Sequence, residues 1–143
     1  MVIIGVVSGY FNPLHKGHLE YIHAAKNQVE FLIVIVNNDY QVTLKGSKPF
    51  MDEQHRLAIM KELRSVDDVM LAVDTDKHVC ASLEILREKY PKNDIYFFNS
   101  GDRVHKEKTA SAETETCKRL GIKYVAIPLP KIYSSSTLLN KVA

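Results

Sequence analysis

Two histidines near the start of the chain have the residue type and the spacing to bind phosphate. His15 and His18 lie in the segment Ser8-Gly9-Tyr10-Phe11-Asn12-Pro13-Leu14-His15-Lys16-Gly17-His18, in which Gly9 permits close approach of the backbone to a ligand. Imidazoles donate hydrogen bonds to phosphoryl oxygens, more strongly when they are protonated. An apolar run precedes this segment and a helical pattern follows it, so both histidines are expected at a helix start, where N–H groups and the dipole attract phosphate. The segment therefore predicts an anion-binding site.

A second group of polar residues lies near the end of the sequence. Ser134, Ser135, Ser136 and Thr137 begin the last predicted helix, where hydroxyls and free N–H groups can hold an oxyanion. Capping of the helix alone would need only one of these side chains. The phosphate motifs G-x-G-x-x-G after the first strand and G-x-x-x-x-G-K-[ST] do not occur, which disfavours hydride transfer and P-loop chemistry.

Short apolar runs at regular intervals predict the strands that position these residues. Each run is continuously apolar, which is typical of strands covered on both faces in a parallel sheet. The intervals leave room for a helix between successive strands, so the pattern predicts an α/β fold: a Rossmann-like three-layer α/β/α arrangement with a five-stranded parallel sheet. The predicted strands are Val2–Val7, Phe31–Val36, Val69–Val73, Ile95–Phe98 and Tyr124–Ile127.

Helical periodicity occupies the intervening segments. Asp52 and Glu53 are expected to open one helix, in which Arg56 faces away from the apolar stripe, and Gly121 is expected to end another. His23 is expected to pack in the core. The predicted helices lie at about 19–26, 52–63, 79–90, 112–120 and 134–141, and two long polar loops lie at 37–51 and 99–111. Ligands of such sheets bind beyond the carboxyl ends of the strands.

Composition limits the classes of protein that remain. A length of 143 residues with 45% hydrophobic residues predicts a single domain, 1–143. A net charge of +2 gives no support for nucleic-acid binding, and the chain has no apolar run long enough to span a membrane. Cys80 and Cys117 lack the spacing of a zinc site and are expected to be reduced thiols, which favours a cytoplasmic protein.

The segment from Gly9 to His18 resembles the G-x-F-[DN]-x-x-H-x-G-H signature of the cytidylyltransferase-like nucleotidyltransferases. Further residues are similar to a short branch of that family, which includes glycerol-3-phosphate cytidylyltransferase and heptose-1-phosphate adenylyltransferases. The similarity spans nearly the whole chain. The residues that carry it are Asn37-Asn38-Asp39, Lys45-Gly46, Pro49, Arg56, Val66-Asp67, Gly101-Asp102 and Ser134-Ser135-Ser136-Thr137.

The resemblance implies transfer of CMP or AMP from CTP or ATP to a phosphorylated small metabolite, by direct in-line attack and with release of pyrophosphate. It implies catalytic roles for His15, His18 and Lys45, and acceptor or phosphate binding by Lys45, Arg56 and Lys131. Lys48 lies close enough to exchange roles with Lys45. The residues expected to bind the nucleotide are Gly9, Tyr10, Phe11, His15, His18, Gly101, Asp102, Ser134, Ser135 and Ser136.

Mg²⁺ is expected to accompany the nucleotide, because it would bridge triphosphate oxygens and offset their charge. The sequence shows no carboxylate cage, so no metal ligand is assigned, and Asp39 is the nearest acid. A homodimer is implied by the resemblance alone.

Several functions remain open at this point. Cytidylyl transfer is slightly favoured, although Lys131-Ile132-Tyr133-Ser134-Ser135 departs from the R-T-E-G-I-S pattern of some cytidylyltransferases. Adenylyl transfer of the heptose-phosphate type, or of the nicotinate or nicotinamide mononucleotide type, is the alternative, because Asn12-Pro13 also occurs in the latter enzymes. A nucleotide-binding module without turnover is a third reading of the same residues.

Overall fold

A computed structural model of the chain describes residues 2–100 and 112–127. Its strands form one five-stranded sheet in the order β3-β2-β1-β4-β5, and every neighbouring pair is parallel. The predicted fold class is therefore confirmed. The strands are β1 (Ile4–Gly9), β2 (Phe31–Val36), β3 (Asp68–Leu71), β4 (Ile95–Ser100) and β5 (Lys123–Ile127).

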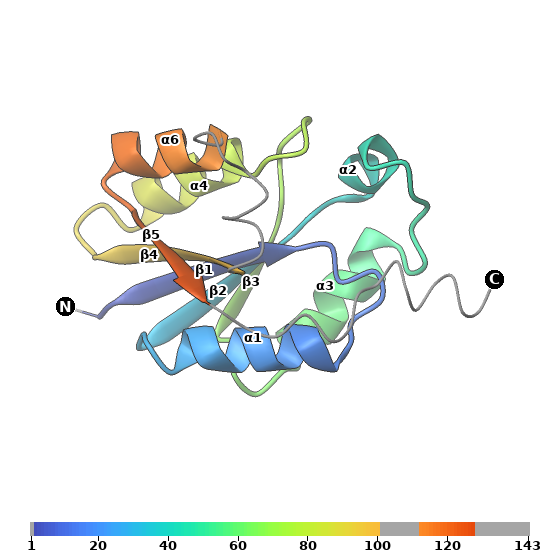
Figure 1. Cartoon of the computed structure of the whole chain (residues 1–143), viewed down its shortest axis with the longest axis horizontal. Helices are drawn as coiled ribbons and strands as arrows, with labels where there is room; N and C mark the ends of the chain where they lie inside the picture. The colour runs from blue at the N-terminus through green and yellow to red at the C-terminus, as the bar shows by residue number, and fades with distance from the viewer. Residues whose placement is uncertain (1, 101–111, 128–143) are drawn as a thin grey trace.

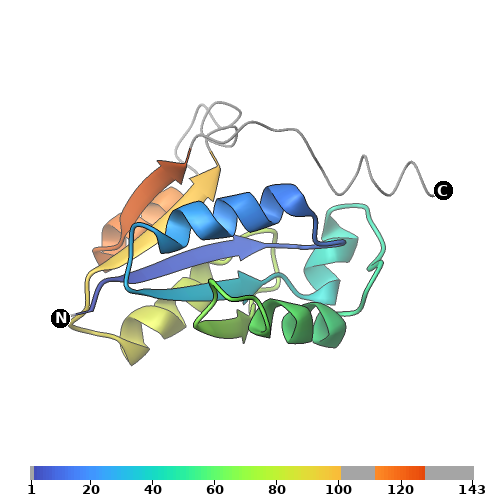
Figure 2. The same ribbon diagram turned by 90° about the horizontal axis from the view of Figure 1, so that it is seen from below.

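Helices cover both faces of this sheet (Figure 1, Figure 2). The helices α1 (Lys16–Lys26) and α3 (Glu53–Lys61) pack on one face, and α4 (Cys80–Lys89) and α6 (Ala112–Leu120) pack on the other. Alternate residues of each central strand face opposite layers, so that Val7 and Val34 pack toward α1 and α3 whereas Val6 and Ile33 pack toward α4 and α6. Burial on both faces explains why these strands are continuously apolar.

Two helix boundaries fall where the sequence predicted them. Asp52 precedes α3 and caps it, since its carboxylate accepts from the His55 amide at 2.9 Å, and Gly121 follows α6 with a φ of 68°. The helix α2 (Asp39–Leu44) was not predicted, because it lies inside the segment 37–51 that was expected to be a loop. The predicted helix at 134–141 lies outside the described residues.

The chain changes direction across the sheet between β1 and β4. The connections from β1 through β2 to β3 run toward one edge, and β5 lies at the opposite edge beside β4. In open α/β sheets, ligands bind beyond the carboxyl ends of the strands at such a switch point. Gly9 ends β1 here, and the segment 10–15 leads from it to α1, with His15 just before the helix and His18 in its first turn.

Two further residues, His23 and Asp67, were named in the sequence analysis and can be placed in the structure. His23 is exposed on α1, so the expectation that it packs in the core is wrong; Ile22 and Ala25 occupy the buried face. Asp67 accepts from the Leu32 amide at 2.8 Å and pairs with Lys26 at 2.5 Å, which ties β3 to the start of β2.

Both cysteines are free thiols, as predicted. Burial, together with the nearby Glu113 and Cys80, raises the pKa of Cys117 to about 12, and burial is the largest of these causes. Burial also raises the pKa of Cys80. Both side chains therefore remain protonated at neutral pH and behave as small packing residues.

Among the residues that the structure describes, no helix has the length and apolar character needed to cross a lipid bilayer.

Gly5 provides a test of how closely the layers pack. A Cβ atom at this position would lie 2.8 Å from Val29 Cγ2 and 2.9 Å from Phe98 Cε2. Gly5→Ala is therefore expected to lower the free energy of unfolding by about 1–3 kcal/mol, because an extra methyl group overpacks the core. Urea denaturation measures this change. An unchanged midpoint would contradict the close packing of β1 against these side chains.

Candidate active site

The two histidines lie at the first turn of α1, as predicted. His15 is the residue before the helix, with φ −142° and ψ 175°, and its backbone N–H donates to His18 Nδ1 at 3.1 Å. The two rings stack with centroids 3.7 Å apart, and the Phe11 ring meets His18 edge-on at 5.0 Å. Backbone and ring contacts thus hold both imidazoles in a fixed pair.

The hydrogen bond to His18 Nδ1 decides which of its nitrogens can donate. A neutral imidazole carries one proton, so with Nδ1 as the acceptor the proton lies on Nε2. Burial lowers the pKa of His18 to about 3, and the charges of His15 and Lys45 contribute in the same direction. Burial also lowers the pKa of His15. At neutral pH the ligand-free protein therefore presents a neutral N–H donor at His18.

Gly9 and Phe11 form the base beneath this pair. Phe11 adopts a φ of 50°, is 2% exposed, and lies so close to Gly9 that a Cβ there would meet Phe11 Cζ at 2.7 Å. The Phe11 ring belongs to the core between the sheet and α1, and it fills the space beside Gly9. Contact of Gly9 and Phe11 with a nucleotide stays a prediction.

Tyr10 and Lys45 meet at the same end of the sheet. Lys45 is the residue that ends α2, and its ammonium lies 4.3 Å from the centroid of the Tyr10 ring. A cation over an aromatic face is an attractive arrangement. Because Lys45 also lowers the pKa of His18, the structure brings the three predicted catalytic residues, His15, His18 and Lys45, into one neighbourhood.

Asn12 binds the segment that follows α2. Its amide Nδ2 donates to the Lys48 carbonyl at 3.0 Å, and its Oδ1 accepts from the Phe50 amide at 2.5 Å and from the Met51 amide at 3.3 Å. An aspartate could accept these bonds but could not donate to Lys48. This role was missed in the sequence, where Asn12 was only one position of a signature.

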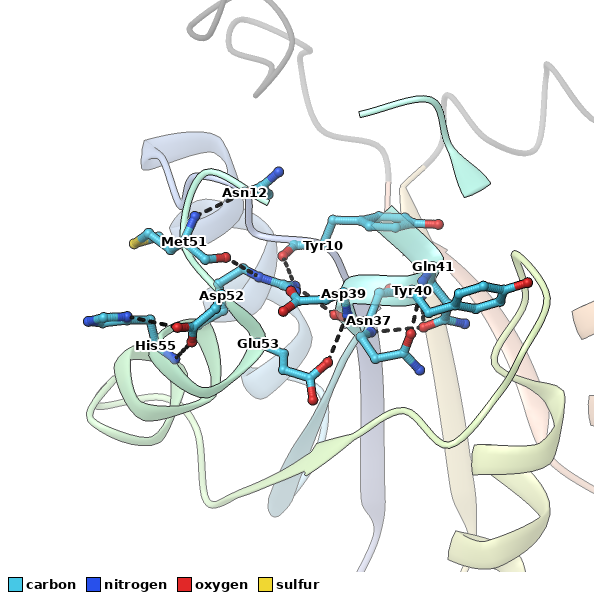
Figure 3. A network of polar contacts seen from close by, with 12 residues as sticks. Tyr10, Asn12, Asn37, Asp39, Tyr40, Gln41, Met51, Asp52, Glu53 and His55 are labelled. Carbon is cyan, nitrogen blue, oxygen red and sulfur yellow. Dashed lines mark hydrogen bonds and ion pairs between the residues drawn. The ribbon is translucent and has the colours of Figure 1, made fainter. Parts of the chain in front are cut away.

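Arg56 requires a correction. The family resemblance implied that it binds a substrate phosphate, and an exposed helical arginine was the alternative, but Arg56 is only 1% exposed. Its guanidinium donates to the carbonyls of Met51 (3.0 Å), Tyr10 (2.8 Å) and Asn37 (2.6 Å), and to Asp39 Oδ1 at 2.7 Å (Figure 3). A phosphate cannot reach a group enclosed in this way. The signal was available, since Arg56 lies one helical turn before the buried Met60.

Asp39 is occupied by this network and is not part of a metal cage. Its carboxylate pairs with Arg56, and its backbone N–H donates to Glu53 Oε1 at 2.9 Å. Within residues 2–100 and 112–127, no group of three His, Cys, Asp or Glu side chains could hold a metal ion. The described side chains therefore do not fit a resident Mg²⁺ site, and the ion stays a prediction tied to the nucleotide.

Other predicted site residues lie outside the described part of the chain. They are Gly101, Asp102, Lys131, Ser134, Ser135 and Ser136.

Comparison with known proteins assigns this geometry to a family. A family model described as cytidylyltransferase-like matches residues 6–140. The chain belongs to the cytidylyltransferase-like family. The resemblance seen in the motif is thereby confirmed, and this family member is a nucleotidyltransferase.

Relatives of this cytidylyltransferase-like chain differ in their named activities. It is 30% identical over 131 residues to an FAD synthase of Thermococcus sibiricus, and the aligned region covers 91% of this chain and 82% of the relative. It is 30% identical over 108 residues to a probable nicotinate-nucleotide adenylyltransferase of Pseudoalteromonas atlantica, which covers 71% of the chain and 49% of the relative. A crystal structure of the lipopolysaccharide core biosynthesis protein from Thermoplasma volcanium matches with a TM-score of 0.69 and 26% identity, covering 91% of this chain and 99% of that one.

Because the Arg56 guanidinium is enclosed, even the conservative substitution of Arg56 by lysine is expected to lower the stability of the protein strongly. Arg56→Lys in this nucleotidyltransferase keeps the charge but loses the planar fork that reaches several carbonyls at once, so the free energy of unfolding should fall by about 3 kcal/mol. Arg64→Lys, at an exposed position, is the control and should change it by less than about 0.5 kcal/mol. Chemical denaturation of both variants measures the difference. Equal stabilities would show that the enclosure of Arg56 is unimportant.

The lowered pKa of His18 predicts how stability depends on pH. Between the folded value of about 3 and the ordinary value of 6.5, the unfolded chain binds a proton that the folded chain does not. Stability should therefore fall as the pH falls through this window, by at most about 1.4 kcal/mol per pH unit from this residue. His18→Gln should make the curve of unfolding free energy against pH shallower. Parallel curves for the variant and the parent would exclude a lowered pKa.

Proposed function

We propose that the protein transfers AMP from ATP to the phosphate group of a phosphorylated small molecule and releases pyrophosphate. The observation that carries this proposal is the joint position of His15, His18 and Lys45 at the carboxyl end of β1, beside the switch point of the sheet. Neutral donors and a lysine suit a polyphosphate better than an uncharged ligand. The names of the relatives support adenylyl transfer over cytidylyl transfer.

The proposed reaction is one displacement at phosphorus. An oxygen of the acceptor phosphate attacks the α-phosphorus of ATP, the bond from that phosphorus to the bridging oxygen breaks, and pyrophosphate leaves with the electron pair. A phosphate nucleophile is already ionised at neutral pH and needs no general base. The protein then contributes position and charge stabilisation, which is how such transfers are generally accelerated.

Each residue has a distinct part in this mechanism. His18 donates from Nε2 to a phosphoryl oxygen on which charge develops, while His15 keeps His18 in that tautomer through its backbone N–H. Lys45 supplies positive charge toward the triphosphate or the acceptor phosphate. If Mg²⁺ entered with ATP, it would offset part of the triphosphate charge, and no described residue is assigned to hold it. A homodimer is also proposed, on the family resemblance alone.

FMN is the first acceptor to test. FAD is FMN that carries an adenylyl group, and an FAD synthase is similar to this chain over 91% of its length. Nicotinate mononucleotide is the second, because of the Pseudoalteromonas relative and the shared Asn12-Pro13 pair. Heptose phosphate and glycerol 3-phosphate complete the panel.

Pyrophosphate release with each acceptor tests the proposed function. ATP and CTP are each supplied with the four phosphorylated acceptors, and product mass identifies the adduct. We expect release with ATP and one aromatic mononucleotide acceptor, and little with CTP. Turnover with CTP and not with ATP would show that the protein transfers a cytidylyl group instead of an adenylyl group. Nucleotide binding without pyrophosphate release from any pair of substrates would indicate a nucleotide-binding module without enzymatic activity.

Substitution of the second histidine tests its proposed role in the transition state. His18→Ala should lower kcat by about 10²–10³-fold and change the KM for ATP far less, because the donated hydrogen bond strengthens as charge develops. His23→Ala is the matched control, since His23 is exposed on the same helix. It should leave kcat unchanged. A loss confined to KM in His18→Ala would contradict the role.

A further inference from the structure

Gln41 is a buried amide whose hydrogen-bonding groups are all engaged. Its side chain belongs to α2 and is 0% exposed. Oε1 accepts from Asn37 Nδ2 at 3.1 Å and from the Asn38 backbone N–H at 3.0 Å. Nε2 donates to the backbone carbonyls of Asp76 and His78, both at 2.8 Å. Two donors and two acceptor sites are all that a glutamine amide has, so this side chain is fully satisfied.

The helix that carries Gln41 needs such support. With six residues, α2 is too short to be stable in water by itself. Asn38 caps it and also donates from Nδ2 to the carbonyls of Ala72 and Asp74, at 2.9 and 3.0 Å. Together with Gln41, this contact fixes α2 against the segment 72–78, which connects β3 to α4. Figure 3 shows Gln41 at the opposite end of the polar network from Asp52 and His55, which lie at the start of α3.

Gln41 is also linked directly to Lys45. The Lys45 backbone N–H donates to the Gln41 carbonyl at 3.2 Å, so the two residues lie one helical turn apart on the same face. From this position the Lys45 ammonium extends over the Tyr10 ring. Loss of the Gln41 contacts would release the last turn of α2, and with it the lysine, while the sheet and the histidines keep their own contacts.

We propose that Gln41 is a positioning residue that sets the place of Lys45 for polyphosphate binding and transfer, by tying α2 to segment 72–78. The inference rests on the proposed function in one respect, namely that Lys45 contacts a phosphate of the substrates. Its action is indirect, since the four hydrogen bonds of the buried Gln41 amide all go to protein groups.

Two variants separate positioning from folding. Gln41→Met keeps the length and removes all four side-chain bonds. Gln41→Glu keeps the acceptors, but when ionised it faces the carbonyls of Asp76 and His78 with no donor. Gln54→Met, at an exposed position on α3, is the matched control. Denaturation curves give the folded fraction of each protein, and all rates are referred to that fraction.

The deciding measurement is a double-mutant cycle with Lys45→Ala. Affinity for inorganic tripolyphosphate is measured by calorimetry, and kcat by pyrophosphate release. Gln41→Met should lower kcat by about ten- to hundredfold, since small misplacement of a reacting group has effects of this size. Adding Gln41→Met to the Lys45→Ala variant should lower kcat and tripolyphosphate affinity little further, because the lysine that Gln41 positions is already absent. Additive losses would overturn the proposal, and so would a Lys45→Ala variant with unchanged binding and rate.

The Gln41→Glu variant allows a second test, in which the rate is rescued at low pH only if Gln41 acts through Lys45. At low pH its protonated carboxyl regains one O–H donor, so its rate relative to the parent should rise as the pH falls. In the Lys45→Ala background this rise should disappear. A rise that persists without Lys45 would overturn the proposal. If the effects of the two substitutions on tripolyphosphate binding are non-additive but no acceptor gives turnover, the positioning role of Gln41 is supported and the proposed reaction is refuted. If turnover occurs but the effects of the two substitutions are additive, the reaction is supported and the positioning role is refuted.

Discussion

A guanidinium withdrawn from water must find partners for its N–H groups, and Arg56 finds them on four described segments near the carboxyl ends of β1 and β2. It joins the Tyr10 carbonyl of the histidine segment, the Asn37 carbonyl after β2, the Asp39 carboxylate of α2, and the Met51 carbonyl before α3. Removal of these contacts would leave a charge buried without compensation, which is far more costly than the loss of an exposed pair. The relative positions of these segments therefore depend on Arg56.

Two amide side chains complete this frame from opposite sides. Asn12 holds the segment that follows α2, and Gln41 holds α2 against the segment after β3. Both use an amide to donate to backbone carbonyls and to accept from N–H groups at once, which no carboxylate can do. Lys45 therefore extends from the end of a short helix that is anchored on both sides, although the lysine side chain itself is exposed. A long polar segment can hold a lysine in a defined position if its backbone is hydrogen-bonded in this way.

The parts that sequence patterns predicted are those decided by local chemistry. The buried strands, the Asp52 cap, the Gly121 terminus and the helix start at the histidines each depend on a few neighbouring residues. The burial of Arg56 and the helix α2 depend on partners far along the chain, such as Tyr10 and Asp76, so polarity alone suggested an exposed arginine and a loop. The sequence does contain one local signal for α2, because Asn38 and Gln41 have the spacing of a helix capping box.

The charge state of the histidine pair follows from the same enclosure. Two imidazoles stacked at 3.7 Å would repel each other if both were protonated, and burial beside the Phe11 ring adds a desolvation cost. The ligand-free site is therefore poor in positive charge at its centre, with Lys45 at its margin. A polyphosphate changes this balance, because its negative charge favours the protonated form of any imidazole that it contacts. For His18, however, protonation would place a second proton on Nδ1 and break the hydrogen bond that this atom accepts from the His15 backbone N–H, so the contact with His15 opposes that shift and favours the neutral donor.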